Sequence, residues 1–284
     1  MITRNPMQLK ALIKNLAKLK GISAQLLMQN YMLERLLERI SISQYQSYFI
    51  LKGGFLIASI VGLDTRTTMD LDTTIKGLPL TLDTAQRFFT DICLIPVDDD
   101  ISFEVLDCSN IRATDDYNGI RVSLCATYLT MSVPLKVDVT TGDRITPSEI
   151  EYDFSLLFDE RKIKILAYNI ETILAEKLET ILSRGIGNTR PRDFYDVYIL
   201  YSLRKRKYRP NILRQALTET ADKRGSSIIL PQYKSILQRI EADTQMNLFW
   251  QKYCDDFSYA RGIEFAKVCR VIIDLCAEII IPSQ

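Results

Sequence analysis

Apolar side chains recur at helical spacing through the first forty residues of the chain. Two amphipathic helices are expected, over residues 7–20 and 23–40, because their leucines and isoleucines return every three or four positions. A short apolar strand is expected at residues 48–51 and ends at a Gly-Gly pair, and a second strand is expected at residues 69–75. The apolar helix between the strands is expected to begin near Phe55. The pattern predicts a strand–turn–helix–strand unit preceded by two helices.

The spacing of apolar residues changes in the middle of the chain. After an expected helix capped by Thr81, apolar and polar residues alternate from residue 101 to residue 139. Three strands of an antiparallel meander are expected there, with a turn over residues 115–119, which read Asp-Asp-Tyr-Asn-Gly. The first half of the chain is therefore predicted to combine helices with a sheet.

Beyond about residue 165 the pattern becomes almost wholly helical. Asn169 is expected to cap one helix and Pro191 to open another, with a glycine-containing break between them. Three further helical stretches are expected at residues 211–221, 231–241 and 258–280. The fold class is therefore predicted to be α+β, with a mixed-sheet domain over residues 1–165 and an all-α domain over residues 166–284.

The amino-acid composition restricts the possible kinds of catalytic site more than it restricts the fold class. The 284 residues are 47% hydrophobic and 25% charged, and 36 basic against 35 acidic residues give a net charge of +1, so no global positive field indicates nucleic-acid binding. Histidine is absent, which excludes imidazole bases, Ser-His or Cys-His pairs and most zinc sites. The six cysteines form no Cys-x-x-Cys pair and are expected to be reduced. With no leader and no membrane-spanning run in the sequence, a cytoplasmic location is expected.

Carboxylates are the remaining candidates for catalysis. Asp70 and Asp72 lie two apart in an expected strand, so their side chains are expected on one face, about 6.7 Å apart along the backbone. Magnesium prefers such oxygen ligands together with substrate phosphates. The glycines of the Gly-Gly pair, Gly53 and Gly54, would allow close approach of a phosphate to the start of the following helix. The alternative is that both acids serve only solubility or turn formation.

A third acid interrupts an apolar strand of the meander. Asp138 lies between Val137 and Val139, late in the strand, and would complete a set of three carboxylates around a metal. The alternative is an acid that ends a strand and faces solvent.

Four segments, taken together and in this order, resemble the AbiEii/AbiGii toxin family of nucleotidyltransferases. They span about residues 52 to 200 and read KGGFLIASIVGLDTRTTMDLD, LKVDVTTGD, NIETILAEKLETILSR and RPRDFYDVYIL. The resemblance implies a polymerase-beta-like nucleotidyltransferase domain followed by a helical domain. It also implies a toxin from a toxin–antitoxin or phage-exclusion module, with a cognate antitoxin as partner. Better-understood relatives add nucleotides to the acceptor end of tRNA.

The resemblance assigns roles to matched positions of the first two segments. Asp70 and Asp72 match the magnesium ligands, and Asp138 matches the acid of the second segment. The positions matched to triphosphate contacts are Gly53, Gly54 and Thr68. Relatives commonly carry Ser or Thr directly after the glycine pair, where this chain has Phe55, and Ser at the position of Thr68.

Lys177 matches the essential lysine of the third segment, and Asp193 and Asp196 both fit the acid of the fourth. Lys177 lies on an otherwise apolar helix, so it needs an anionic partner, and the two acids lie three apart on one helical face. One of them is expected to pair with Lys177 while that lysine meets a β- or γ-phosphate. The alternative is an interhelical salt bridge of structural use only.

The predicted activity is transfer of a nucleoside monophosphate from an NTP to RNA, most simply the 3′ end of tRNA, with Mg²⁺ or Mn²⁺ as cofactor and growth arrest as the result. Lys177 would stabilise charge on the departing pyrophosphate. Candidates for phosphate contacts with NTP or RNA are Arg66, Lys76, Arg190, Arg192 and the basic cluster at residues 204–209. Alternatives are nucleotidylation of a protein or small molecule, and a non-catalytic module that binds nucleotide or antitoxin. The sequence leaves open the NTP, the acceptor and the oligomeric state.

Overall fold

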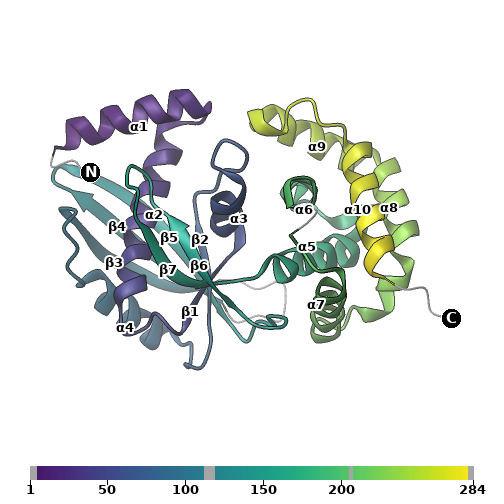
Figure 1. Ribbon diagram of the computed structural model, residues 1–284, viewed down its shortest axis with the longest axis horizontal. Helices are drawn as coiled ribbons and strands as arrows, with labels where there is room; N and C mark the ends of the chain where they lie inside the picture. The colour runs from purple at the N-terminus through teal and green to yellow at the C-terminus, as the bar shows by residue number, and fades with distance from the viewer. Residues whose placement is uncertain (1–4, 112–118, 205–206, 281–284) are drawn as a thin grey trace. The chain divides into compact units, whose positions relative to one another are not determined.

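The chain divides into two compact units in a computed structural model that describes residues 5–111, 119–204 and 207–280. Unit 1 consists of Met1–Asp143 and Ile150–Ala167, and unit 2 consists of Arg144–Glu149 and Tyr168–Gln284. The main division, after Ala167, lies close to the boundary expected near residue 165. Figure 1 labels the elements of both units, and each unit is described by itself below.

Unit 1 opens with two capped helices, α1 (Pro6–Lys20) and α2 (Ala24–Ile42). Both begin where a side chain satisfies a free amide of the first turn: the Asn5 side chain accepts from the Met7 N–H, and the Ser23 hydroxyl accepts from the Leu26 N–H. The two helices expected from the apolar spacing are confirmed.

A seven-stranded mixed sheet follows in unit 1, with strand order β3-β4-β5-β2-β1-β7-β6 among the described residues. The pairs β2·β5 and β1·β7 are parallel, and the others are antiparallel. The strands are β1 (Phe49–Lys52), β2 (Leu71–Ile75), β3 (Ile101–Ile111), β4 (Gly119–Tyr128), β5 (Met131–Thr141), β6 (Ile150–Ser155) and β7 (Lys162–Ala167). The predicted antiparallel meander is confirmed as β3-β4-β5, and its expected turn at 115–119 lies mostly outside the described residues. The α+β mixed-sheet fold is thus the one expected.

Two boundaries near the Gly-Gly pair differ from the expectation. Helix α3 (Gly53–Val61) begins at the first glycine and not near Phe55, because Gly53 takes a positive φ of 65° and turns the chain directly from strand into helix. Strand β2 begins at Leu71, so Asp70 lies in a bend before the strand. The strand-alternation argument for Asp70 was therefore wrong, although it holds for Asp72.

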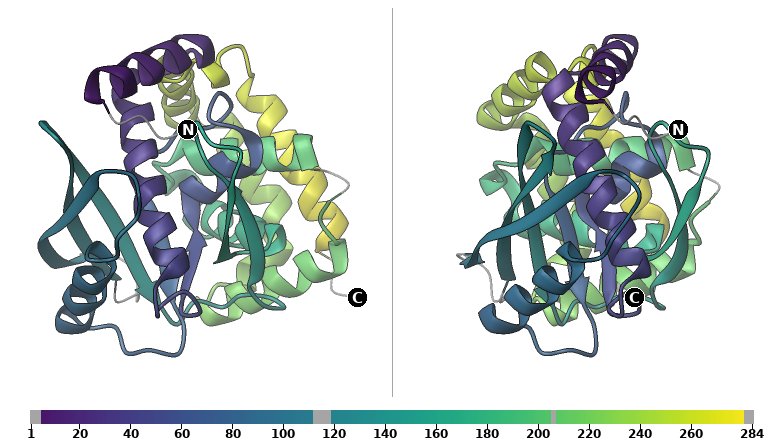
Figure 2. Two further views of the ribbon diagram at one scale, coloured as in Figure 1. Left: turned by 60° about the vertical axis from the view of Figure 1, so that its left-hand side comes forward. Right: turned by 90° about the vertical axis from the view of Figure 1, so that its left-hand side faces the viewer.

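Near β2 and β5, one face of the sheet carries buried apolar side chains and the other face carries acids. Leu71 on β2 and its register partner Val137 on β5 are fully buried, and α2 contacts β5 and β7 while α4 (Leu82–Cys93) contacts β3 and β4. Figure 2 shows α2 crossing the strands. Side chains alternate along a strand, so the residues next to Leu71 and Val137, namely Asp72 and Asp138, project to the other face.

Unit 2 is built from helices joined by short 3₁₀ turns. Its α-helices are α5 (Ile170–Arg184), α6 (Pro191–Arg204), α7 (Pro210–Lys223), α8 (Tyr233–Ala242), α9 (Thr244–Asp256) and α10 (Phe265–Ile279). Asn169 caps α5 as expected, since its side chain accepts from the Thr172 N–H. Helix α9 was missed, although Met246, Trp250 and Tyr253 form its buried stripe at helical spacing. Strands β6 and β7 were also missed, because their alternation is short and carries charges on the exposed positions.

No helix in the described ranges is long and apolar enough to cross a membrane. All six cysteines are free, as expected, and Cys269 and Cys276 are buried in α10. Burial raises the pKa of each of these two thiols to about 12, which keeps them protonated and unreactive at neutral pH.

Candidate active site

A row of charged side chains crosses four strands of unit 1. Arg121 of β4 lies opposite Asp138 of β5, Asp138 lies opposite Asp72 of β2, and Asp72 lies opposite Lys52 of β1. Residues directly opposite one another on neighbouring strands project from the same face. The row therefore places two acids side by side, with one basic residue on each side of them.

Asp138 is held by a two-pronged hydrogen bond from Arg121. The guanidinium Nε donates to Asp138 Oδ1 at 2.8 Å, and Nη2 donates to Oδ2 at 2.7 Å. Donating these hydrogen bonds to Asp138 raises the pKa of Arg121, and the negative charges of Asp70 and Asp72 raise it further. The negative charges of all three acids therefore act on Arg121 in the same direction.

The other end of the row is tied to the end of β5. Lys52 Nζ donates to Asp143 Oδ2 at 2.5 Å, and the same oxygen accepts from the Thr140 hydroxyl at 2.9 Å. Lys52 is mostly buried, with 15% of its side chain exposed. The lysine thus links the strand that enters the Gly-Gly turn to the strand that carries Asp138.

The Gly-Gly pair lies directly against the acid of β2. A Cβ placed on Gly53 would lie 2.6 Å from both Cβ and Cγ of Asp72 and closer still to Oδ2. The Gly54 N–H donates to the same oxygen at 3.3 Å. Only glycine fits at Gly53, because the carboxylate occupies the space of a side chain and because φ is positive there. The turn expected to approach a phosphate is therefore placed beside the predicted metal ligand.

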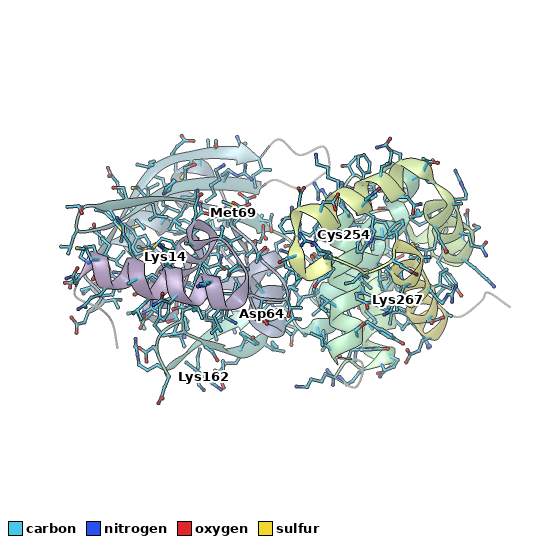
Figure 3. All side chains as sticks on the ribbon, turned by 90° about the horizontal axis from the view of Figure 1, so that it is seen from above. Lys14, Asp64, Met69, Lys162, Cys254 and Lys267 are labelled. Carbon is cyan, nitrogen blue, oxygen red and sulfur yellow. The ribbon has the colours of Figure 1, made fainter. Side chains whose placement is uncertain are left out.

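The loop before β2 contributes the remaining phosphate candidates. A Cβ on Gly54 would lie 2.9 Å from the Thr68 hydroxyl and 3.1 Å from Arg66 Nη2. Thr68 is anchored by α2, since Asn30 Nδ2 donates to the Thr68 carbonyl at 2.7 Å. Figure 3 labels Met69, the next residue of this loop. The structure thus brings together the four residues predicted to bind the nucleotide in unit 1.

Arg66 itself is almost fully buried, with 1% exposure, and its guanidinium donates to the Thr67 carbonyl. An arginine in this position supports the loop beside Gly54. The described conformation does not present it to an RNA backbone, which was one of its two predicted roles.

Phe55 points into the core of unit 1. It is 3% exposed, and its ring stacks on Phe154 of β6 with a centroid separation of 5.5 Å and an interplanar angle of 1°. The residue that replaces the usual Ser or Thr after the glycine pair is therefore a packing residue. Backbone amides, the Thr68 hydroxyl and Arg66 Nη2 are polar groups that the structure describes at this turn.

In unit 2, Lys177 of α5 is paired with both candidate acids of α6. Its Nζ lies 2.5 Å from Asp193 Oδ1 and 3.2 Å from Asp196 Oδ2. The lysine side chain is 22% exposed, whereas the two acids are 7% and 0% exposed. Asp193 Oδ2 is buried without a hydrogen-bond partner among the described residues. The expected ion pair is present, and it involves both acids.

The remaining basic candidates are distributed over both units. Lys76 in unit 1 and Arg190 and Arg192 in unit 2 are exposed. The basic cluster at 204–209 lies partly outside the described residues, and its last member, Arg209, forms an ion pair with Glu171 at 3.5 Å.

The donor set of unit 1 suits a hard cation. Asp70 and Asp72 supply two carboxylates next to a turn that accepts close approach, and magnesium in nucleotide sites commonly takes one or two carboxylates plus phosphates. Among the described residues, however, no three acidic or thiol side chains are gathered as a ready metal cage. Both oxygens of Asp138 accept hydrogen bonds from Arg121. Arg121 was missed by sequence reasoning, because a basic residue between Ile120 and Val122 is an ordinary polar position of an alternating strand.

The chain was compared with known families and structures. It is similar to JHP933 from Helicobacter pylori, with 15% identity, 90% of this chain and 92% of that chain covered, and a TM-score of 0.48. It is also similar to an antigenic nucleotidyltransferase-like protein from Paracoccidioides brasiliensis, with 15% identity, 73% and 92% covered, and a TM-score of 0.40. No protein of curated function matches it. The sequence model described as "Nucleotidyl transferase AbiEii toxin, Type IV TA system" matches residues 35–268, most of the chain. The chain therefore belongs to the AbiEii family of nucleotidyl transferase toxins of type IV toxin–antitoxin systems.

Proposed function

We propose that this protein transfers a nucleoside monophosphate from an NTP to an RNA acceptor, the 3′ end of tRNA, with release of pyrophosphate. A tRNA with a modified acceptor end cannot be used in translation, so growth stops until a cognate antitoxin neutralises the protein. Family membership supports the class of reaction and the toxin–antitoxin setting.

The observation that carries the proposal is the contact of the Gly53–Gly54 turn with Asp72, which lies opposite Asp138 in the sheet. A backbone turn that admits a phosphate, placed against carboxylates that suit a divalent cation, is what an NTP–metal complex requires. The Thr68 hydroxyl lies beside Gly54 and adds a donor to the same turn.

Asp70 and Asp72 would hold Mg²⁺, with Asp138 as a third ligand. Bound magnesium would supply positive charge that stabilises the phosphates during transfer. The chain's own contribution is to position Asp72 and Asp138 on neighbouring strands and to bring the Gly53–Gly54 turn, whose Gly54 amide donates to Asp72, against them. Asp138 is also the carboxylate best suited to accept the proton of the attacking hydroxyl.

Lys177 is proposed to stabilise the charge that develops on pyrophosphate. Two buried acids hold its ammonium in one place, because Asp193 and Asp196 both lie within ion-pair distance of Nζ. A lysine that is pre-positioned in this way loses little conformational entropy when it meets an anion.

The test is transfer of label from each α-labelled NTP, with Mg²⁺, to total tRNA by the purified chain. Asp72→Asn removes the charge while conserving side-chain size, and Asp98→Asn is the matched control, because Asp98 is exposed and lies outside the site. We expect label on tRNA from one NTP with wild type and with Asp98→Asn, and a loss of at least about 100-fold with Asp72→Asn.

Three outcomes would contradict the proposal. Label on protein or on a small molecule and not on RNA would move the acceptor to another class. Label on RNA that persists in Asp72→Asn would remove the acid from the mechanism. Absence of label with every NTP, together with retained binding of nucleotide or antitoxin, would indicate a non-catalytic binding module.

A further inference from the structure

We propose that Arg121 controls the access of a divalent cation to Asp138. In the protein without nucleotide the guanidinium occupies both Asp138 oxygens, and it releases them when a phosphate of the incoming NTP offers it another anionic partner. The proposal rests on the proposed function, because it concerns the metal and nucleotide of that same site.

The geometry of the pair is the first reason. Arg121 and Asp138 lie directly opposite each other in the register of β4 and β5, and two hydrogen bonds of 2.8 and 2.7 Å use both carboxylate oxygens. A carboxylate paired in this way has its charge compensated and both oxygens engaged, so a metal ion must compete with the guanidinium for it. Among the described residues, the acids of the site do not form a three-ligand group.

The exposure of the pair is the second reason, and it separates Arg121 from the structural arginines of unit 1. The Arg39–Asp99 pair is buried, with exposures of 3% and 0%, and holds α2 to the start of β3. In the Arg121–Asp138 pair the corresponding values are 40% and 19%. An ion pair open to solvent contributes little to stability, so the guanidinium can leave without unfolding the sheet.

The charge balance of the site is the third reason. The guanidinium of Arg121 is hydrogen-bonded to Asp138, which lies opposite Asp72 in the sheet, so one cation lies beside two neighbouring carboxylates. A divalent ion would neutralise the same negative charge, so Arg121 and the ion compete for Asp138. The planar guanidinium fork matches phosphate as well as carboxylate, which gives the released side chain a partner on the nucleotide.

The experiment measures Mn²⁺ binding to the full chain without nucleotide, by the electron paramagnetic resonance signal of free Mn²⁺. Arg121→Gln frees Asp138, and we expect it to bind Mn²⁺ about fivefold more tightly than wild type, which corresponds to about 1 kcal/mol. Adding Asp138→Asn to Arg121→Gln is expected to abolish that gain. Arg121→Lys, which keeps the charge but loses the fork, is expected to fall between wild type and Arg121→Gln.

Lys136→Gln is the control for a change in local charge. Lys136 is an exposed lysine two residues before Asp138 on the same strand face, opposite Ser123 and not Arg121. An equal gain of Mn²⁺ affinity in Lys136→Gln, or a gain in Arg121→Gln that survives Asp138→Asn, would overturn the proposal. Unchanged or weaker Mn²⁺ binding by a folded Arg121→Gln protein, checked by circular dichroism, would also overturn it.

A second measurement separates this proposal from the proposed reaction. Binding of a non-hydrolysable NTP with Mg²⁺ is expected to weaken about fivefold or more in Arg121→Gln, because the phosphate loses the guanidinium. Neither binding measurement requires transfer to an acceptor. If both changes are seen and no acceptor is labelled, the role of Arg121 stands and the proposed acceptor fails. If nucleotide affinity is unchanged in Arg121→Gln, the phosphate half of the proposal fails.

Discussion

Gly53 is packed against the carboxylate of Asp72, at a distance that leaves no room for a side chain on the glycine. The contact joins the first residue of α3 to the second residue of β2, 19 positions later in the chain. It therefore makes the conformation of the turn depend on the position of the acid.

Gly53→Ala is expected to destabilise unit 1 by about 2 kcal/mol or more, because the methyl group collides with Asp72 and because φ is positive. Transfer activity is expected to be lost together with stability. Urea unfolding and the labelling assay measure the two effects. Gly142→Ala is the control, since Gly142 has a φ of 77° and open space around it, and it is expected to cost about 1 kcal/mol. Equal costs in the two variants would show that the contact with Asp72 is unimportant.

Lys177→Gln leaves two buried acids of α6 without the ammonium between them, and we expect it to destabilise unit 2 by roughly 3–5 kcal/mol. Adding Asp193→Asn and Asp196→Asn removes the uncompensated charge and is expected to restore most of the free energy of unfolding. Transfer activity is expected to stay lost in this triple variant, because the proposed role of Lys177 is to act on phosphate itself. Recovery of activity along with stability would assign the lysine a purely structural role. Lys252→Gln, on an exposed position of α9, is expected to change neither quantity.

Glu34 makes the stability of unit 1 depend on pH. Burial raises the pKa of this carboxyl from 4.5 to about 7, and the charge of Arg35 and the Leu157 N–H reduce the shift without cancelling it. The folded protein thus holds the proton more tightly than the unfolded chain does. The contribution of Glu34 to stability is therefore fully present below about pH 4.5 and is lost as pH rises to about 7.

Urea unfolding at pH 5 and pH 8 of wild type and Glu34→Gln checks this sign. We expect the stability of wild type relative to Glu34→Gln to fall by roughly 1–3 kcal/mol between the two pH values. Glu38 shares Arg35 with Glu34, at 2.6 Å from Nη1, and that contact is kept in the variant. A relative stability that is constant or rises with pH would contradict the assignment.

Phe55→Ser places the hydroxyl common in relatives after the Gly-Gly pair. Because Phe55 is buried and stacked on Phe154, we expect a loss of roughly 3–5 kcal/mol of stability and no gain in NTP affinity. Phe55→Leu, which keeps most of the apolar volume, is the matched control and is expected to cost less and to leave nucleotide binding unchanged. Tighter NTP binding by Phe55→Ser would mean that this side chain faces the phosphate turn.

The sequence predicted much of the fold because the signals it carries are local. Caps such as Thr81 and Asn169 satisfy amides within three residues, and apolar spacing marks a helix or strand within a window of about a dozen positions. Helix α9 and strands β6 and β7 were not predicted for the same reason, because their local apolar patterns are short or are mixed with polar residues. The two boundary errors, at Gly53 and Asp70, concern one or two residues. At these positions the conformation of the turn determines where the helix or strand begins, and apolar spacing carries no information about it.

The candidate acids were also visible in the sequence, because Asp70 and Asp72 lie two apart in an expected strand and Asp138 interrupts an apolar one. Which of these acids lie next to one another in space could not be predicted from the sequence. Parallel pairing of β2 with β5 sets Asp72 opposite Asp138 across 66 positions of chain, and no local pattern specifies that register.

The sequence by itself determined which residue types are available for chemistry: carboxylates, lysine and arginine with no imidazole. The tertiary structure decided which of them meet. It placed Arg121 on Asp138, Lys177 between Asp193 and Asp196, and the Gly53 turn on Asp72. The physical reason is that periodicity arises from the backbone geometry of neighbouring residues, whereas contacts between distant side chains depend on how whole elements pack and pair.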